Sequence, residues 1–236
     1  DREIGAVCSM PGVEHAVSAA RVVMEETPHV LVSGDHAVEL AADFGVETGV
    51  DLWSDDTREK WGDLDDVPEG TPSEHLDWLA EKFGGNPDSA ESGDSASSDP
   101  TDDDPKNHDT VGAVAYEPET DEFAAATSTG GRWLALAGRV GDVPQIGSGF
   151  FAAPSGAASA TGAGEDIAKA TLTRRAVRHL ESGDDAQTAA DRAVAEFAEL
   201  TGSSAGVIVL DGDGNAGSAF NSEAMQTAVS SRSATE

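Results

Sequence analysis

The sequence contains few basic residues. Among its 236 residues, 14 lysines and arginines stand against 45 aspartates and glutamates, and the formal net charge at pH 7 is −31. Lysine occurs only at Lys60, Lys82, Lys106 and Lys169. A surface this acidic repels nucleic-acid phosphates and anionic bilayers. The composition therefore argues against nucleic acids and membranes as partners.

Cysteine and long apolar runs are also scarce. The only cysteine, Cys8, excludes an intramolecular disulfide and a cysteine-based zinc site. No apolar run approaches the roughly 20 residues of a membrane-spanning helix. The start of the chain, DREIGAV, has neither the basic nor the apolar region of a signal peptide, and the six histidines include no pair at ligand spacing. We therefore expect a cytoplasmic protein with no bound metal and no cofactor.

The abundant feature is negative charge. At low salt, repulsion among like charges destabilises the compact state, whereas molar salt shortens the screening length to about 3 Å. We interpret the composition as adaptation to a salt-rich cytoplasm. The alternative is an ordinary acidic protein.

Helical patterns dominate the first 85 residues. Apolar residues recur three and four positions apart in three predicted helices. These helices span 13–26, 35–45 and 72–84. Ser73 is the expected N-cap of the third and Gly84 its stop. The segment HVLVSG at 29–34 is predicted to form a short buried strand.

A polar segment divides the chain. Residues 86–109 are mostly Ser, Asp, Gly, Pro and Asn, which cannot bury enough apolar surface to offset their chain entropy. We predict a disordered linker there. The whole chain is expected to be one structural domain, with residues 1–85 before the linker, 110–228 after it and a flexible tail at 229–236.

The second half alternates strand pairs with helices. VGAVAYE at 111–117 and EFAAATS at 122–128 flank a turn-forming PETD and predict a β-hairpin. A second strand pair is predicted within 206–220. Amphipathic helices are expected over 165–182 and 186–200. Such elements suggest sheets packed under helices in layers.

Three short motifs resemble known functional sequences but lack their context. GSSAG at 202–206 matches a nucleophile elbow around Ser204, but that motif needs a strand before it and a helix after it. GSGFFA at 147–152 has no surrounding βαβ unit. DGDGN at 211–215 lacks the later ligands of a calcium loop. We expect a helix-to-strand loop at 202–206, a hairpin turn at 211–215 and no dinucleotide site at 147–152.

Small and hydroxyl residues concentrate around three segments of the second half. Thr110 begins a strand directly after the linker, and TSTGG (127–131) and ATGAGE (160–165) follow. Between the latter two, GRVGD carries Arg139 and Asp142.

These residues could form an acyl-transfer site for a small zwitterion. Arg139 could bind a carboxylate through two hydrogen bonds, and Asp142 could accept from an ammonium group. Gly162 and Gly164 open onto a predicted helix, where backbone N–H groups could hold an oxyanion. From spacing alone, tight turns between strands remain the alternative.

The order of four motifs, HDTVGAVA, TSTGG, GRVGD and ATGAGE, resembles the plant-type asparaginase and isoaspartyl peptidase family. AARVVMEETPHVLVSGDHAVELA in the first half and FNSEAM at 220–225 extend the resemblance. These are N-terminal-nucleophile hydrolases. The resemblance implies an α+β fold, the four-layer αββα sandwich, and a homodimer of autocleaved two-chain protomers. The implied substrates are β-aspartyl peptides and L-asparagine.

Residue roles carry over from the resemblance. Self-cleavage would fall between Asp109 and Thr110, releasing Thr110 as nucleophile. Thr129 matches the assisting threonine. The remaining matches are Arg139 and Asp142 for the substrate α-carboxylate and α-amino groups, Thr161 and Gly162 for the oxyanion, and Gly164 for the substrate amine.

Two departures leave rival interpretations open. No segment matches the family's N-terminal region, which holds the first core strand, an asparagine-bearing loop and a cation-binding loop. We expect a fragment or a misassigned start, and an uncleaved, non-catalytic module is one alternative. The HDT junction also occurs in glycosylasparaginases, which are the nearest enzymatic alternative, although TSTGG and FNSEAM favour the asparaginase branch.

The charge predicts salt dependence. Dialysis from molar salt into dilute buffer should unfold the protein, because its 45 acidic groups are then no longer screened. The helical circular dichroism signal should fall and should return when salt is restored. Full stability without salt would contradict the adaptation to a salt-rich cytoplasm.

Overall fold

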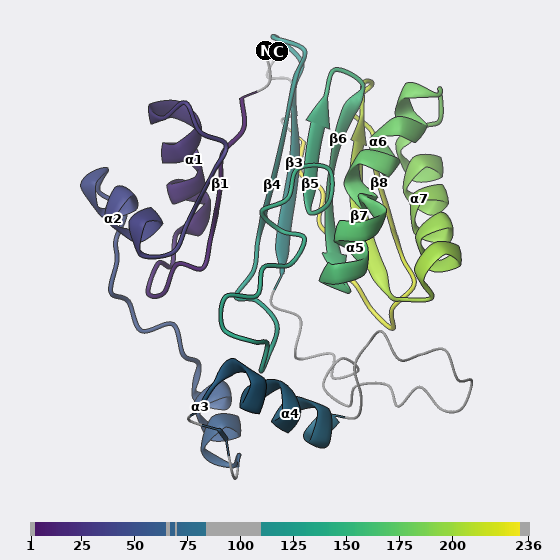
Figure 1. Cartoon of the computed structure of the whole chain (residues 1–236). Helices are drawn as coiled ribbons and strands as arrows, with labels where there is room; N and C mark the ends of the chain where they lie inside the picture. The colour runs from purple at the N-terminus through teal and green to yellow at the C-terminus, as the bar shows by residue number, and fades with distance from the viewer. Residues whose placement is uncertain (1–2, 65–66, 69, 84–109, 232–236) are drawn as a thin grey trace.

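The computed structural model describes residues 3–64, 67–68, 70–83 and 110–231 (Figure 1). The predicted linker at 86–109, Asp109 and the end of the predicted tail lie outside these residues. The helices are α1 (Ala16–Glu26), α2 (Asp35–Asp43), α3 (Asp55–Gly62), α4 (Pro72–Phe83), α5 (Gly164–Ala170), α6 (Leu172–Glu181) and α7 (Ala186–Thr201). The strands are β1 (Ala6–Cys8), β2 (Leu31–Ser33), β3 (Val111–Glu117), β4 (Glu122–Ser128), β5 (Phe150–Ala153), β6 (Gly156–Gly162), β7 (Ala205–Asp211) and β8 (Ala216–Phe220).

The described chain mixes helices and sheets, as an α+β fold requires. Strands β5–β6–β7–β8 form an antiparallel sheet, β3 and β4 form an antiparallel hairpin, and β1 pairs in parallel with β2. Helices α6 and α7 cover one face of the β5–β8 sheet, and the β3–β4 hairpin lies against the other (Figure 1). Helices α1 and α2 lie beyond β1, on the far side of the hairpin (Figure 1).

The main core lies between α6, α7 and the β5–β8 sheet. Its largest fully buried side chains include Phe197, Leu172, Ile167 and Val207, and alanines fill much of the remaining interface. Small side chains bring backbones close together. A Cβ on Gly217 of β8, for example, would lie 2.3 Å from the Ala186 backbone at the start of α7.

The hairpin is joined to the sheet by hydroxyl groups and a glycine. The Thr127 hydroxyl on β4 donates to the Gly149 carbonyl at 2.9 Å and lies 2.6 Å from the Ser159 hydroxyl on β6. Opposite Thr127 in the hairpin register is Gly112. A Cβ on Gly112 would lie 2.1 Å from the Ser159 Oγ, so only glycine permits this separation of the two sheets.

The N-terminal part buries less than its pattern predicts. Ala19 and Val23 of α1 are buried, but Val17 on the predicted apolar face is 46% exposed. The segment predicted as a buried strand at 29–34 forms only β2, and Leu31 is 47% exposed. The expectation of burial was wrong: among the described residues β2 pairs only with the three-residue β1, and its contacts with α1 and α2 leave Leu31 and Ser33 exposed.

Other elements follow or depart from prediction in identifiable ways. The hairpin strands have the predicted bounds, and the loops expected around Ser204 and at 211–215 are loops. The predicted helix over 165–182 is divided by Thr171, whose left-handed backbone (φ 50°) separates α5 from α6. Within the part of the chain that the structure describes, no helix has the length and apolarity of a membrane span.

The cap predicted for the third helix was wrong by two residues. Helix α4 begins at Pro72, so Ser73 lies inside it. Thr71 instead accepts from the Glu74 N–H at 3.4 Å, while the Glu74 carboxylate accepts from the Thr71 N–H at 2.5 Å. This reciprocal arrangement is a capping box, and Pro72 suits the first helical position because its missing N–H needs no partner there. Gly84, the predicted stop, lies outside the described residues.

The sheet contact yields a stability prediction. Gly112→Ala should lower the free energy of unfolding by about 1–3 kcal/mol, because the new methyl group overpacks the interface at Ser159. Ser159→Gly in the same chain should recover part of the loss. Gly62→Ala is the control, since a Cβ there meets open space. Denaturant unfolding in molar salt measures all variants, and an unaltered midpoint for Gly112→Ala would contradict the contact.

Candidate active site

Two threonines meet at the open end of the β3–β4 hairpin. Val111 pairs with Ser128 in the last rung of the ladder, so Thr110 and Thr129 emerge on neighbouring ends of the two strands. The Thr110 hydroxyl donates to the Thr129 Oγ1 at 3.2 Å. Both residues are half-buried. The hairpin register therefore brings together two residues that are 19 positions apart.

The segment after β4 turns sharply around Thr129. The Gly131 N–H donates to the Thr129 hydroxyl at 3.1 Å, and Gly131 has a positive φ of 99°. Thr127, two residues before Thr129, carries the contact to β6 described above. The position of Thr129 is thus fixed from both sides.

Arg139 and Asp142 lie on the irregular segment that joins β4 to β5. The Arg139 guanidinium donates to both carboxylate oxygens of Glu165, from Nε at 2.7 Å and from Nη2 at 2.6 Å. Its side chain is 20% exposed. The predicted carboxylate anchor is therefore already bound to a carboxylate of the chain itself.

Asp142 is buried and incompletely paired. It is 5% exposed, and its Oδ2 has no hydrogen-bond partner among the described residues. Burial raises the pKa of Asp142 from 3.8 to about 6. A hydrogen bond from its own backbone and the nearby Arg139 charge oppose this rise, and the Glu165 charge adds to it. The Asp142 Oδ2 can therefore accept a hydrogen bond from a ligand.

Two glycines permit the close approach of these charged groups. A Cβ on Gly164, at the start of α5, would lie 2.8 Å from the Asp142 Oδ1 and 2.9 Å from the Arg139 Nη2. A Cβ on Gly141 would lie 2.8 Å from the Arg139 Nη1. A side chain at either position would displace the arginine or the aspartate.

Thr161 and Gly162 end strand β6 beside β7. Thr161 pairs with Gly206 and Gly162 with Ala205. Gly162 has a positive φ of 134°, and a Cβ there would lie 2.5 Å from the Ser204 carbonyl oxygen. This conformation is accessible only to glycine.

All seven described candidates line one cavity. They are Thr110, Thr129, Arg139, Asp142, Thr161, Gly162 and Gly164. This cavity is large, about 4490 Å³, and is also lined by β1, α1, β5, β7, β8 and residues 221–231; the candidates lie where the β3–β4 hairpin, the segment after β4 and the β6–α5 junction border it. Asp109, the residue before the predicted cleavage point, lies outside the described residues.

The chain matches a known protein family over its whole length. The family model described as asparaginase matches residues 1–236. The chain belongs to the asparaginase family.

Three relatives are identical to this chain at about a third of the aligned positions. A plant-type L-asparaginase of Pyrococcus abyssi is 36% identical over 227 residues, which cover 96% of this chain and 68% of the relative. An isoaspartyl peptidase of Salmonella typhimurium is 37% identical over 227 residues, covering 95% and 65%. The isoaspartyl peptidase/L-asparaginase of Rattus norvegicus is 35% identical over 216 residues, covering 91% and 56%.

Sequence reasoning overlooked two residues that shape the site. Glu165, the partner of Arg139, lies inside the quoted ATGAGE motif and follows the glycine that contacts Arg139. Thr127, which links the hairpin to β6, opens the TSTGG motif. Glu165 is the only charged residue of its motif, and Thr127 is one of three hydroxyl residues in its own. The sequence does not show their partners, which lie 26 and 32 positions away.

The raised pKa of Asp142 predicts a pH-dependent cost in stability. Its folded-state pKa of about 6 exceeds the unfolded value of about 3.9, so the folded state binds the proton more tightly and loses stability as pH rises from 4 towards 6. Asp142→Asn removes this loss. Its free energy of unfolding relative to wild type should therefore increase between pH 4 and pH 8, by up to about 3 kcal/mol.

Denaturant unfolding at both pH values measures the effect. Asp43→Asn, at an exposed position at the end of α2, is the control and should show no comparable gain. A difference between Asp142→Asn and wild type that stays constant with pH would contradict the assigned burial cost.

Proposed function

We propose that the protein is an autoprocessing threonine amidohydrolase that cleaves β-aspartyl dipeptides and L-asparagine. The observation that carries the proposal is the Thr110–Thr129 hydroxyl contact in the cavity that also contains Arg139 and Asp142. The names of the relatives, L-asparaginase and isoaspartyl peptidase, support the substrate class.

Arg139 and Asp142 suit the aspartyl half of the substrate. An α-carboxylate would bind the Arg139 guanidinium in competition with Glu165. The α-ammonium would donate to the Asp142 Oδ2, which has no partner among the described residues. Binding requires ionised Asp142, so KM should rise as pH falls below about 6. Free α-amino and α-carboxyl groups on one aspartyl unit are the features of an isoaspartyl substrate.

Self-cleavage would generate the nucleophile. The Thr110 hydroxyl attacks the Asp109 carbonyl and gives up its proton, the Asp109–Thr110 C–N bond breaks as the Thr110 nitrogen takes up a proton, and an ester forms on Thr110 Oγ1. Water hydrolyses this ester, which leaves a carboxylate on Asp109 and a free α-amine on Thr110. That amine, with an unperturbed pKa of about 7.7–8.0, can take the proton of the Thr110 hydroxyl.

Turnover repeats the same chemistry on the substrate. Thr110 Oγ1 attacks the side-chain carbonyl of the aspartyl unit, and the C–N bond breaks as the leaving nitrogen takes a proton. Ammonia leaves from L-asparagine, and an amino acid leaves from a dipeptide. Thr161 and Gly162 are proposed to hold the oxyanion, Thr129 to assist the nucleophile and Gly164 to contact the substrate amine. Water then releases aspartate from the acyl-enzyme.

The architecture proposed for the active enzyme is a four-layer αββα sandwich. The two facing sheets, covered by α6 and α7 on one side and flanked by α1 and α2 on the other, support this arrangement (Figure 1). We further propose a cytoplasmic homodimer of two-chain protomers that is adapted to high salt.

The cleavage step provides the direct test. Intact-mass analysis in molar salt should give two fragments that meet at Asp109 and Thr110. Thr110→Ala should remain one chain and hydrolyse neither substrate, because the methyl group cannot form an ester. Thr120→Ala, at an exposed position in the hairpin turn, is the control and should cleave normally.

Different results would identify each rival. If the wild-type protein stays a single chain and shows no turnover, the result would favour the non-catalytic module. Faster hydrolysis of N-glycosylated asparagine than of β-aspartyl dipeptides would favour a glycosylasparaginase. Substantial turnover by Thr110→Ala would place the nucleophile elsewhere.

A further inference from the structure

Three tryptophans form a connected cluster beside the candidate site. Trp133 lies four residues after Thr129 on the segment that leaves β4. Its ring meets Trp61 of α3 edge to face, with centroids 6.2 Å apart at 88°. Trp61 in turn meets Trp53 at 5.9 Å and 64°. We call Trp53, Trp61 and Trp133 the tryptophan cluster.

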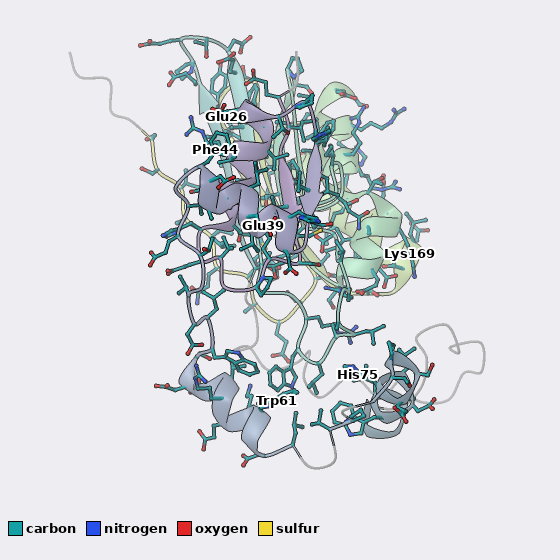
Figure 2. All side chains as sticks on the ribbon, turned by 60° about the vertical axis from the view of Figure 1, so that its left-hand side comes forward. Glu26, Glu39, Phe44, Trp61, His75 and Lys169 are labelled. Atoms are coloured by element: carbon teal, nitrogen blue, oxygen red, sulfur yellow. The ribbon has the colours of Figure 1, made fainter. Side chains whose placement is uncertain are left out.

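The cluster holds α3 next to the segment after β4. Helix α3 contributes no buried residue, so its docking does not come from a packed core. In Figure 1 it lies below the end of the hairpin, and Figure 2 shows Trp61 on the side of α3 that faces the sheets. The aromatic contacts therefore connect an otherwise polar helix to the catalytic end of the hairpin.

The cluster remains unusually open for such large apolar rings. Trp53 is 46% exposed and Trp61 43%, and the neighbouring Leu52 is 52% exposed. Aromatic surface of this kind on a protein with a net charge of −31 is a candidate for ligand contact, since exposed apolar patches commonly mark binding grooves.

The cavities connect this apolar surface to the reacting residues. Trp133 and Leu52 line the large cavity that also contains Thr110 and Arg139, and Leu52 lines a second, smaller cavity as well. Trp53 lines this smaller cavity, and the two cavities share Gly130, the residue directly after Thr129. A molecule attached to an aspartyl unit at Thr110 can thus extend along the segment after Thr129 to the cluster.

Arg139 and Asp142 account for only half of a dipeptide substrate. The residue that leaves also has a side chain and a carboxylate. Arg132, adjacent to Trp133, adds positive charge here, and its field contributes to the lowered pKa of Glu165 after the larger effect of Arg139. The same neighbourhood therefore offers apolar surface for a side chain and a cation for a carboxylate.

We infer that the tryptophan cluster is the subsite for the leaving residue, and that it favours β-aspartyl dipeptides whose second residue is aromatic or large and aliphatic. This inference rests on the proposed function. An acidic second residue should be disfavoured by the charge of the protein. L-Asparagine, which releases ammonia, leaves the subsite empty.

The test compares substrates within each variant. We would measure kcat/KM for β-aspartyl-phenylalanine, β-aspartyl-glycine and L-asparagine in molar salt. Wild type should prefer the phenylalanine dipeptide over the glycine dipeptide. Trp133→Ala should lower that preference by about 2- to 13-fold, the range expected for loss of one aromatic pair. Trp133→Phe should retain most of it.

A ratio of two substrates is independent of how much of the variant is folded, so a partly unfolded Trp133→Ala still gives an interpretable result. Phe44→Ala is the matched control, because Phe44 is 49% exposed on the surface and lines neither cavity. An unchanged preference in both Trp133→Ala and Trp53→Ala, whose side chains each line one of the two cavities, would overturn the subsite while leaving the proposed function intact. Wild type that hydrolyses none of the three substrates would overturn both.

Discussion

The candidate site depends on how closely the β3–β4 hairpin approaches the β5–β8 sheet. The Thr127–Ser159 contact and the absence of a side chain at Gly112 set that distance. The hairpin register then carries Thr110 to Thr129 at its open end. A shift of one residue in that register would turn Thr127 away from β6 and separate the threonines. One polar contact between two small-residue strands thus connects sheet packing to the proposed chemistry.

The charged part of the site follows a different principle. Arg139, Asp142 and Glu165 approach one another only because Gly141 and Gly164 leave space for the guanidinium and carboxylate groups. Because burial raises the pKa of Asp142, its ionised form lowers the stability of the folded protein when no ligand is bound. A ligand ammonium would compensate for that cost, so the destabilising group and the proposed binding group are the same. Such opposition between stability and binding is common where a site is prepared for a charged ligand.

Local patterns predicted the elements that carry their own signals. Alternation around PETD defined the hairpin, and apolar spacing defined α7. Strands β5 and β6 were missed because runs such as GAASATG lack a polar–apolar alternation when both faces are buried. Helix α3 was missed because it is polar on all sides and is docked by tryptophans distant in sequence. The site residues were found through ordered motifs, whereas the Arg139–Glu165 pair arises only in three dimensions.

The uneven distribution of tryptophan determines what an optical probe would observe. Three of the four tryptophans lie in the cluster around α3, while the main core is built from alanine, valine, leucine, isoleucine and phenylalanine. Indole emission therefore reports chiefly the docking of α3, whereas far-ultraviolet dichroism reports all the described helices together, of which α3 is only one short member of 8 residues. The two signals need not change together on heating. Non-coincident melting curves would then reflect local release of α3 and would not demonstrate a folding intermediate of the core.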